Sequence, residues 1–261
     1  IIACFLNLKC IINISQQVSL SPILSDAAND LHALDPARSV QQGYLTISDE
    51  WKLMNCTNCN FERKLQFHAG KLPSVMLLGD GARLRQVMTN IVGNIHRYTP
   101  VDSPVEIAVG VMKASITPNE LSKLPSVKES LKEFLEAAEV SQSTDTGHKY
   151  AVIRVVDHGP GVPEESLSRI FERFYIADPS RAREKGGTGL GMAIAQSVVK
   201  AHHGFICATI SSPSEASTDS KTNLDDTMDG SEPIDVKPHG LTLTVVLPVN
   251  EIEDPSKLVS D

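Results

Sequence analysis

The sequence predicts an α/β fold. Short apolar segments of strand length alternate along the chain with longer segments whose apolar residues recur at helical spacing. The chain has 261 residues, of which 41% are hydrophobic, so it is long enough for one large domain with a packed core. No internal repeat is visible. We expect one domain over residues 21–250, an unassigned segment over 1–20 and a tail over 251–261.

The first expected helix covers residues 21–34. Pro36 follows it and stops it. Residues 41–71 have no clear period, and we expect irregular structure there, with an insert at about 46–72. The apolar face of the helix consists of residues at helical spacing: Ile23, Leu24, Ala27, Ala28, Leu31 and Leu34.

A strand over 75–78 leads into the clearest helix, residues 80–98. Asp80 suits its N-cap, and Thr99-Pro100 ends it. A strand over 105–112 follows, and residues 114–149 form a charged insert with one helix over 127–138. The apolar face of the long helix is Leu84, Val87, Met88, Ile91 and Ile95.

The second half of the sequence has the apolar pattern of three more strands, over residues 151–156, 205–210 and 241–247. A glycine-rich turn and a short helix follow the first of them. Residues 186–203 lead from a glycine loop into a helix, which Gly204 is placed to cap. Residues 212–239 are rich in Ser, Thr, Asp and Pro, so we expect a solvated, disordered insert. The expected inner face of the helix is Leu190, Ile194, Ser197, Val198 and Ala201.

Charge and cysteine content narrow the class of protein. A net charge of −8 disfavours nucleic acid as a partner. Five cysteines, few and odd in number, indicate reduced thiols and a cytoplasmic setting. Cys56 and Cys59 form a C-x-x-C, which is half a zinc site or a redox pair, but nothing in the sequence completes it. Residues 1–14 are apolar but too short to span a membrane, and they lack the features of a signal peptide.

Three polar or glycine-rich stretches could carry chemistry. On the long helix, Asn90, Asn94 and Arg97 share one stripe. A carboxamide oxygen can ligate Mg²⁺, and a guanidinium can pair with phosphate, although a solvated helix flank gives the same pattern. Asp157, with Gly159 and Gly161 after it, follows a buried strand, where a carboxylate can accept from an adenine amino group; alone, it could be an ordinary turn.

The third stretch is glycine-rich and opens a helix. Its residues are Gly187, Thr188, Gly189, Leu190 and Gly191. Backbone N–H groups at a helix start favour anions, so the stretch predicts a phosphate cradle. It fits neither a P-loop nor a dinucleotide fingerprint. A flexible loop with a helix cap remains the simpler alternative.

Taken in order, these stretches resemble the catalytic domains of histidine kinases in the Bergerat (GHKL) ATPase superfamily. Residues 83–98 resemble the N box of that family, 157–161 and 187–191 its two glycine boxes, and Phe171-Glu172-Arg173-Phe174-Tyr175 its F box. The run 171–204, which includes Asp178-Pro179-Ser180-Arg181, is especially similar to actinobacterial kinases. The resemblance covers roughly residues 20–45, 75–113 and 150–248.

The resemblance implies a fold and a set of roles. The fold would be a two-layer α/β sandwich, a mixed sheet with three main helices on one face. ATP and Mg²⁺ would be bound, with Asn94 as metal ligand and Asn90 beside it. Tyr98 would stack near the adenine and Asp157 would bind its amino group. The second glycine box would line the phosphates, and residues 172–187 would form a mobile segment over ATP.

The resemblance also implies partners: a dimerisation hairpin that carries the phosphoacceptor histidine, and a response regulator. None of the eight histidines has the sequence context of that acceptor, so we expect it to lie outside this chain, in a longer protein anchored in the membrane. This chain itself would make no direct membrane contact. Two positions depart from the family: Ile95 replaces the usual Ala, and Arg97 the usual Lys.

Two rival functions remain open. A related ATPase would hydrolyse ATP, but such enzymes carry a glutamate as base where this chain has Asn90. A degenerate kinase would serve as a scaffold; the intact glycine boxes argue against it, whereas Ile95 leaves it open.

Overall fold

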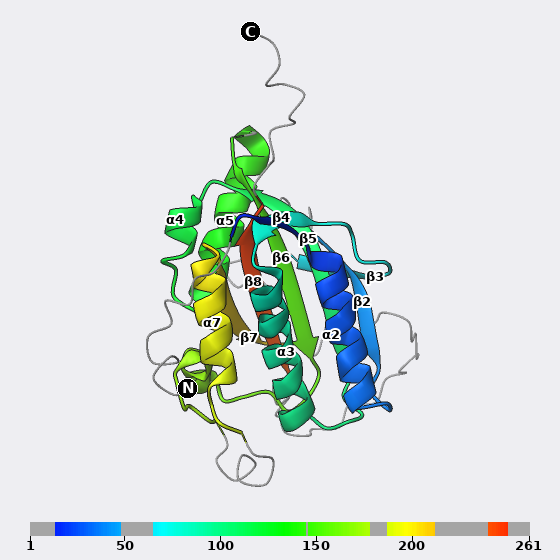
Figure 1. The fold of residues 1–261 in the computed structure, drawn as a ribbon. Helices are drawn as coiled ribbons and strands as arrows, with labels where there is room; N and C mark the ends of the chain where they lie inside the picture. The colour runs from blue at the N-terminus through cyan, green and yellow to red at the C-terminus, as the bar shows by residue number, and fades with distance from the viewer. Residues whose placement is uncertain (1–13, 48–64, 145, 178–186, 212–239, 250–261) are drawn as a thin grey trace, which may run out of the picture.

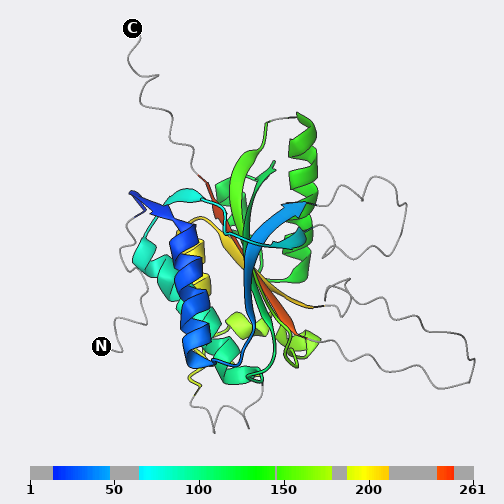
Figure 2. The same cartoon turned by 90° about the vertical axis from the view of Figure 1, so that its right-hand side faces the viewer.

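The computed structural model describes residues 14–47, 65–144, 146–177, 187–211 and 240–249. They form a six-stranded sheet, a separate two-stranded ribbon, and helices on both faces of the larger sheet (Figures 1 and 2). The elements in chain order are β1 (Gln16–Ser19), α2 (Leu20–Leu34), β2 (Val40–Ile47), β3 (Leu65–Ala69), β4 (Met76–Gly79), α3 (Gly81–Tyr98), β5 (Val105–Ala114), α4 (Pro118–Leu121), α5 (Lys128–Thr144), β6 (His148–Asp157), the 3-10 turns η3 (Glu164–Ser166) and η4 (Arg169–Phe171), α7 (Gly191–Ala201), β7 (Phe205–Ile210) and β8 (Leu241–Pro248).

The main sheet has the strand order β3-β2-β5-β6-β8-β7. β2 and β5 run parallel, and the other neighbouring pairs run antiparallel, so the sheet is mixed. β6 lies at its centre between β5 and β8, where Asp157 pairs with Val105 on one side and with Leu241 on the other. The short strands β1 and β4 pair antiparallel with each other outside this sheet.

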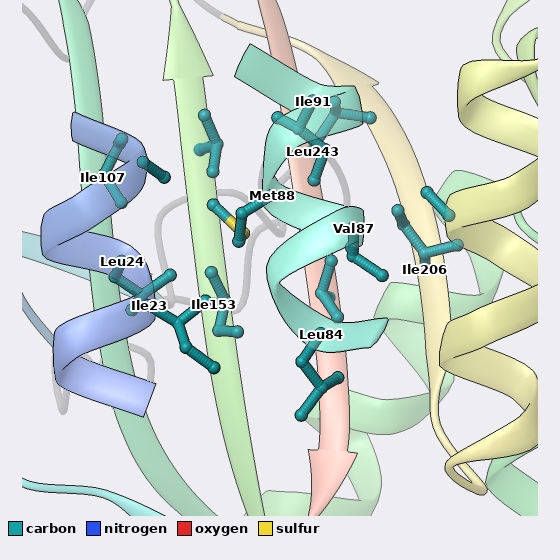
Figure 3. Packing of buried hydrophobic residues seen from close by; sticks show 14 of the residues in the cluster. Ile23, Leu24, Leu84, Val87, Met88, Ile91, Ile107, Ile153, Ile206 and Leu243 are labelled. Carbon is teal, nitrogen blue, oxygen red and sulfur yellow. The ribbon is translucent and has the colours of Figure 1, made fainter. Parts of the chain in front are cut away.

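Helices α2, α3 and α7 lie side by side on one face of the sheet (Figures 1 and 2). Their apolar side chains interlock with those of the central strands, as Figure 3 shows for Met88 and Ile91 of α3, Leu24 of α2 and Ile153 of β6. This face holds the larger hydrophobic core. The predicted α/β fold with a mixed sheet and three helices on one face is confirmed.

The predicted insert 114–149 covers the opposite face of the sheet. Its helix α5 packs Phe134 and Leu135 against Tyr150 of β6 and Phe205 of β7, and Figure 2 shows it on the far side of the sheet from α2, α3 and α7. The expected helix over 127–138 is therefore correct but too short, and a second short helix, α4, precedes it. The insert therefore adds a third layer to the expected two-layer sandwich.

The expectation of irregular structure over 41–71 is wrong for the described part of that stretch, which holds most of β2 and all of β3; residues 48–64 lie outside the described residues. β2 and β3 form an antiparallel hairpin at the edge of the sheet. Of the eight residues of β2, only Gly43 and Leu45 are buried. A strand with so few buried positions lacks the apolar alternation that identifies strands in a sequence, so the strand pattern here is weak.

Two details of α7 also differ from expectation. Its buried residues are Met192, Ala193, Ala195, Val198 and Val199, so Val198 alone of the expected inner face is fully buried. The left-handed residue that ends the helix is His203, with φ 58°, rather than Gly204. Gly204 donates its N–H to Val199 O at 3.0 Å, and a side chain there would overlap the carbonyl of Val246. Close approach to β8, not backbone conformation, requires this glycine.

Near the N-terminus, part of the unassigned segment is ordered structure: β1 covers 16–19 and α2 begins at Leu20. The predicted disordered insert 212–239 and four of the cysteines, including the Cys56–Cys59 pair, lie outside the described residues. Cys207 is buried in β7, and burial raises the pKa of its thiol to about 12. Among the described residues, every helix is too short or too polar to cross a membrane.

One matched pair on α2 tests the assignment of its buried face. Leu31 is 0% exposed in the core, whereas Leu34, expected on the same face, is 52% exposed. Leu31→Ala should lower the free energy of unfolding by about 2–5 kcal/mol, because it removes buried methyl groups and leaves a cavity. Leu34→Ala should change it by about 0.5 kcal/mol or less. Urea denaturation followed by circular dichroism measures both, and equal losses would contradict the placement of α2.

Candidate nucleotide-binding site

The sequence-predicted site residues come together at one end of the helical face. The C-terminal end of α3, the N-terminal end of α7 and the end of β6 meet there, at the lower end of the molecule in Figure 1. α3 and α7 pack directly against each other in opposite directions, which places residues 90–98 beside residues 187–191. Three motifs that are far apart in sequence therefore border one region.

The stripe of α3 lies at the margin of the core. Asn90, Asn94 and Arg97 are all half-buried, and none points fully into solvent. The Nδ2 atom of Asn90 is buried without a hydrogen-bond partner, and a side chain on Gly191 would lie 3.7 Å from the Asn90 amide oxygen. An orphaned amide donor is costly unless a ligand or water satisfies it. The stripe is therefore partly covered by neighbouring residues, and the amide of Asn90 has an N–H group that a ligand or a water could accept.

Glycines of the 187–191 loop are required by their neighbours. A side chain on Gly187 would overlap the hydroxyl of Tyr98 and lie 3.6 Å from Cδ of Arg97. Gly189 has φ +66°, and a Cβ there would lie 2.6 Å from the backbone of Phe174. The backbone of this loop thus runs close to the C-terminal end of α3, where any other residue would fill the space.

The N-terminus of α7 has no side-chain cap. Its N-cap residue is Leu190, which supplies no side-chain acceptor, and the Thr188 side chain is exposed nearby. Helix N-termini carry unpaired N–H groups and the positive end of the helix dipole. With Arg97 of α3 close to Gly187, this end of the helix is suited to an anion such as a phosphate group.

Asp157 is the buried acid of the site, with 5% of its surface exposed at the end of β6. Its Oδ1 accepts a hydrogen bond from the N–H of Gly159 at 3.0 Å. Burial raises the pKa of this carboxyl, and the backbone N–H groups of Gly159 and Leu241 oppose the rise only in part. Such a carboxylate gains by accepting a further donor from a ligand.

The two glycines after Asp157 fit the chain tightly against its neighbours. A Cβ on Gly159 would lie 2.7 Å from the methyl group of Thr99, at the end of α3. Gly161 has φ +67°, and a Cβ there would lie 2.9 Å from the carbonyl oxygen of Gly240. The turn after β6 is therefore wedged between the end of α3 and the start of β8.

Sequence reasoning missed two charged residues beside this turn, Asp35 and Arg38. Both are buried, and the guanidinium of Arg38 bonds to Asp35 and to the end of α3. Burial alone would raise the pKa of Asp35, but hydrogen bonds from Arg38 and His96 outweigh it and hold the pKa below its usual value. An acidic and a basic residue three apart after a helix could have signalled a pair; their burial depends on the tertiary fold.

The F-box stretch packs beside α7. Phe171 is buried in the core, while Phe174 is 68% exposed with φ 64° and donates its N–H to Gly189 O at 2.9 Å. Tyr175 bonds through its hydroxyl to Ser166 at 2.8 Å. Of the segment expected to cover ATP, residues 178–186 lie outside the described residues.

Two of the histidines on the helices of this face, His202 and His96, form hydrogen bonds within the fold. His202 is buried at the opposite end of α7, where its Nε2 accepts from the N–H of Asp80 at 3.0 Å and its Nδ1 lies 2.8 Å from Val198 O. His96 bonds to Asp35, and His32 is exposed on α2. Within the described part of the chain, no three His, Cys, Asp or Glu side chains gather as a metal site.

Comparison with known proteins identifies similar sequences and folds. Residues 124–251 match the family model described as histidine kinase-, DNA gyrase B-, and HSP90-like ATPase. The chain is 35% identical over 164 residues to the probable sensor histidine kinase TcrY of Mycobacterium tuberculosis, and 31% identical over 146 residues to the signal transduction histidine-protein kinase BaeS of Escherichia coli.

These alignments cover 63% and 56% of this chain, but only 26% and 23% of the relatives, so the chain spans about a quarter of their length. Among solved structures, the mycobacterial sensor histidine kinase MprB superposes with a TM-score of 0.51 over 91% of this chain and 99% of that one. At 16% identity this similarity supports the fold alone.

The raised pKa of Asp157 predicts how its substitution changes stability with pH. The folded state binds the proton more tightly than the unfolded state, so burial of Asp157 costs nothing below pH 3.8 and costs most once the pH exceeds the raised pKa. Asp157→Asn, which keeps the acceptor oxygen, should therefore be more stable than wild type at pH 7. The gain should shrink towards pH 4.

Urea denaturation of both proteins across pH 4–7 measures this difference. Asp102→Asn removes one exposed carboxylate from the turn after α3 and is the control for the change in net charge. A difference for Asp157→Asn that is independent of pH would contradict a raised pKa.

Proposed function

Because this chain carries a domain of the histidine kinase-, DNA gyrase B- and HSP90-like ATPase family, we propose that it is the ATP-binding catalytic domain of a two-component sensor histidine kinase. One observation carries the proposal: a buried acceptor, Asp157, lies at the end of β6 beside a glycine-lined helix start and a stripe of amides. The adenine of ATP would suit the end at Asp157, and its triphosphate would suit the glycine-lined start of α7.

In this proposal, the adenine amino group donates to Asp157, whose buried carboxylate favours an amino group over the carbonyl of guanine. Gly159 and Gly161 let the backbone approach the base, and Tyr98 lies beside it. The backbone N–H groups of 187–191 and the Arg97 guanidinium bind the phosphates. The orphaned Nδ2 of Asn90 would find its acceptor there.

Mg²⁺ fits the same stripe, because an amide oxygen suits this hard cation, which commonly takes the rest of its ligands from phosphates and water. Asn94, one helical turn after Asn90, would supply that oxygen. When bound, the ion would neutralise charge on the phosphates. The residues of this chain would orient the nucleotide and keep the γ-phosphoryl group in line for attack.

The reaction would be phosphoryl transfer to histidine. A ring nitrogen of the acceptor would form a bond to the γ-phosphorus as the bond from that phosphorus to the β,γ-bridging oxygen breaks, and ADP would leave. The acceptor would stand on a dimerisation hairpin, and the phosphoryl group would pass on to a response regulator. The domain would work in the cytoplasm as part of a larger, membrane-anchored protein.

An ATPase that hydrolyses ATP is the second candidate from this family. It needs a base to activate water, and the resemblance of residues 83–98 to the N box places Asn90, whose amide cannot take a proton, at the position of that base. The amide therefore favours transfer over hydrolysis.

The metal assignment predicts the effect of Asn94→Ala. Mg²⁺ should strengthen ATP binding by the wild-type chain and much less in the variant, since the variant lacks the oxygen ligand. Calorimetric titration with ATP, with and without Mg²⁺, measures this difference. Asn119→Ala, an exposed asparagine on α4, is the control and should respond to Mg²⁺ as the wild type does. Equal Mg²⁺ dependence in Asn94→Ala would move the metal elsewhere.

The proposed reaction predicts transfer to an added acceptor. The chain should not label itself on histidine when incubated with labelled Mg-ATP, because His96 bonds to Asp35 and His202 lies at the far end of α7 from the glycine loop. Labelled, acid-labile and base-stable phosphate should form on an added dimeric hairpin that carries an acceptor histidine. Release of inorganic phosphate with no phosphohistidine would support the ATPase instead.

A further inference from the structure

Arg38 is among the largest fully buried side chains of the protein, and all of its polar partners lie at one place. Its Nε and Nη2 donate to Oδ2 of Asp35 at 3.0 and 2.8 Å. Its Nη1 donates to Oγ1 of Thr99 at 3.0 Å and to the carbonyl of Ser103 at 2.9 Å, and Nη2 reaches the Thr99 carbonyl at 3.4 Å. One guanidinium therefore joins the end of α2 to the end of α3.

The residues to which Arg38 donates hydrogen bonds belong to the segment that packs against the turn after Asp157. Thr99 comes directly after Tyr98, and its methyl group lies against Gly159. Gly159 in turn donates its N–H to Asp157. The N–H of His158 donates to the carbonyl of Pro104, at 3.1 Å, in the same segment that follows α3. The path from Arg38 to Asp157 is thus a chain of direct contacts.

A buried ion pair contributes little net free energy to folding. Removing two charges from water costs free energy that their attraction seldom returns in full, and apolar residues of equal volume are often as stable. Asp35 balances the charge of Arg38 and also bonds through Oδ1 to Nδ1 of His96 at 2.8 Å. The forked geometry of arginine, however, allows one side chain to fix several acceptors at once.

We propose that Arg38 is a positioning residue for the base of the nucleotide: it fixes the Thr99–Ser103 segment, and through it the Tyr98 side chain and the Gly159 turn that orients Asp157. This inference rests on the proposed function, in which Asp157 and Tyr98 contact the adenine. Arg38 itself does not touch the ligand. Its loss should weaken recognition of the base and leave the phosphate end unchanged.

Electrostatics supports the same role. Burial raises the pKa of Asp157, and the charges of His158 and Arg38 both oppose that rise. The charge of Arg38 therefore helps to keep Asp157 ionised and able to accept. When that charge is removed, the acid limb of ATP binding should move to higher pH, an effect that loss of packing alone would not produce.

The test is a pair of matched double variants of the full chain. Asp35→Asn/Arg38→Met removes the buried pair without leaving an unpaired buried charge. Asp26→Asn/Arg85→Met removes an ion pair of the same residue types in which both side chains are about half exposed, and it is the control. Calorimetric titrations with Mg-ATP and Mg-GTP between pH 5 and 8 are compared with the wild type, and circular dichroism verifies folding.

The wild type and the control should prefer ATP to GTP by the same ratio. In Asp35→Asn/Arg38→Met, ATP affinity should fall about ten-fold while GTP affinity stays within about two-fold, which corresponds to about 1.4 kcal/mol of base recognition. If the double variant does not fold, Thr99→Val, which removes one acceptor of Arg38 and keeps the shape, should lower the ratio in the same direction.

The outcomes separate this inference from the function on which it rests. A wild-type chain that binds no ATP, or binds ATP and GTP equally, would overturn the proposed function. A wild type that prefers ATP, together with an unchanged ratio and an unchanged acid limb in a folded Asp35→Asn/Arg38→Met, would overturn the role of Arg38 and leave the proposed function standing. An unchanged ratio in Thr99→Val would do the same.

Discussion

A buried carboxylate at the end of the central strand is the constraint that organises this domain. Asp157 requires hydrogen-bond donors around its carboxylate, since burial of an ionised group without them costs free energy. The turn after β6 supplies the N–H of Gly159, β8 supplies that of Leu241, and the end of α3 confines the turn through Thr99. The neighbouring strands β5 and β8, the end of α3 and the glycines at 159 and 161 together form the surroundings of this one group.

The sequence allowed much of this to be predicted, because the elements that build the helical face have strong periods. α3, for example, has a long apolar stripe and an N-cap aspartate, and Asp80 does accept from the N–H of Arg83 at 3.1 Å. The three motifs could be found because each combines glycines or amides with the end of a regular element. Their proximity follows from α3 and α7 lying antiparallel on the sheet.

What could not be predicted depends on contacts between distant residues. The hairpin β2–β3 is stabilised by its pairing at the sheet edge, and its own apolar pattern is too sparse to reveal it. Arg38 reads in the sequence as a solvent-exposed residue, and only the approach of Asp35, Thr99 and Ser103 accounts for its burial. The helix α5 was expected from its apolar spacing, but its position over the second face of the sheet depends on contacts with β6 and β7.

The pairing of His202 with Asp80 has a consequence for the whole helical face. Burial lowers the pKa of this imidazole, so it stays neutral under mildly acidic conditions in which an ordinary histidine would gain a proton. Its Nε2 therefore keeps its lone pair for the N–H of Asp80. The far ends of α3 and α7 are thus joined by a hydrogen bond to a neutral imidazole, and burial of this histidine favours that neutral form.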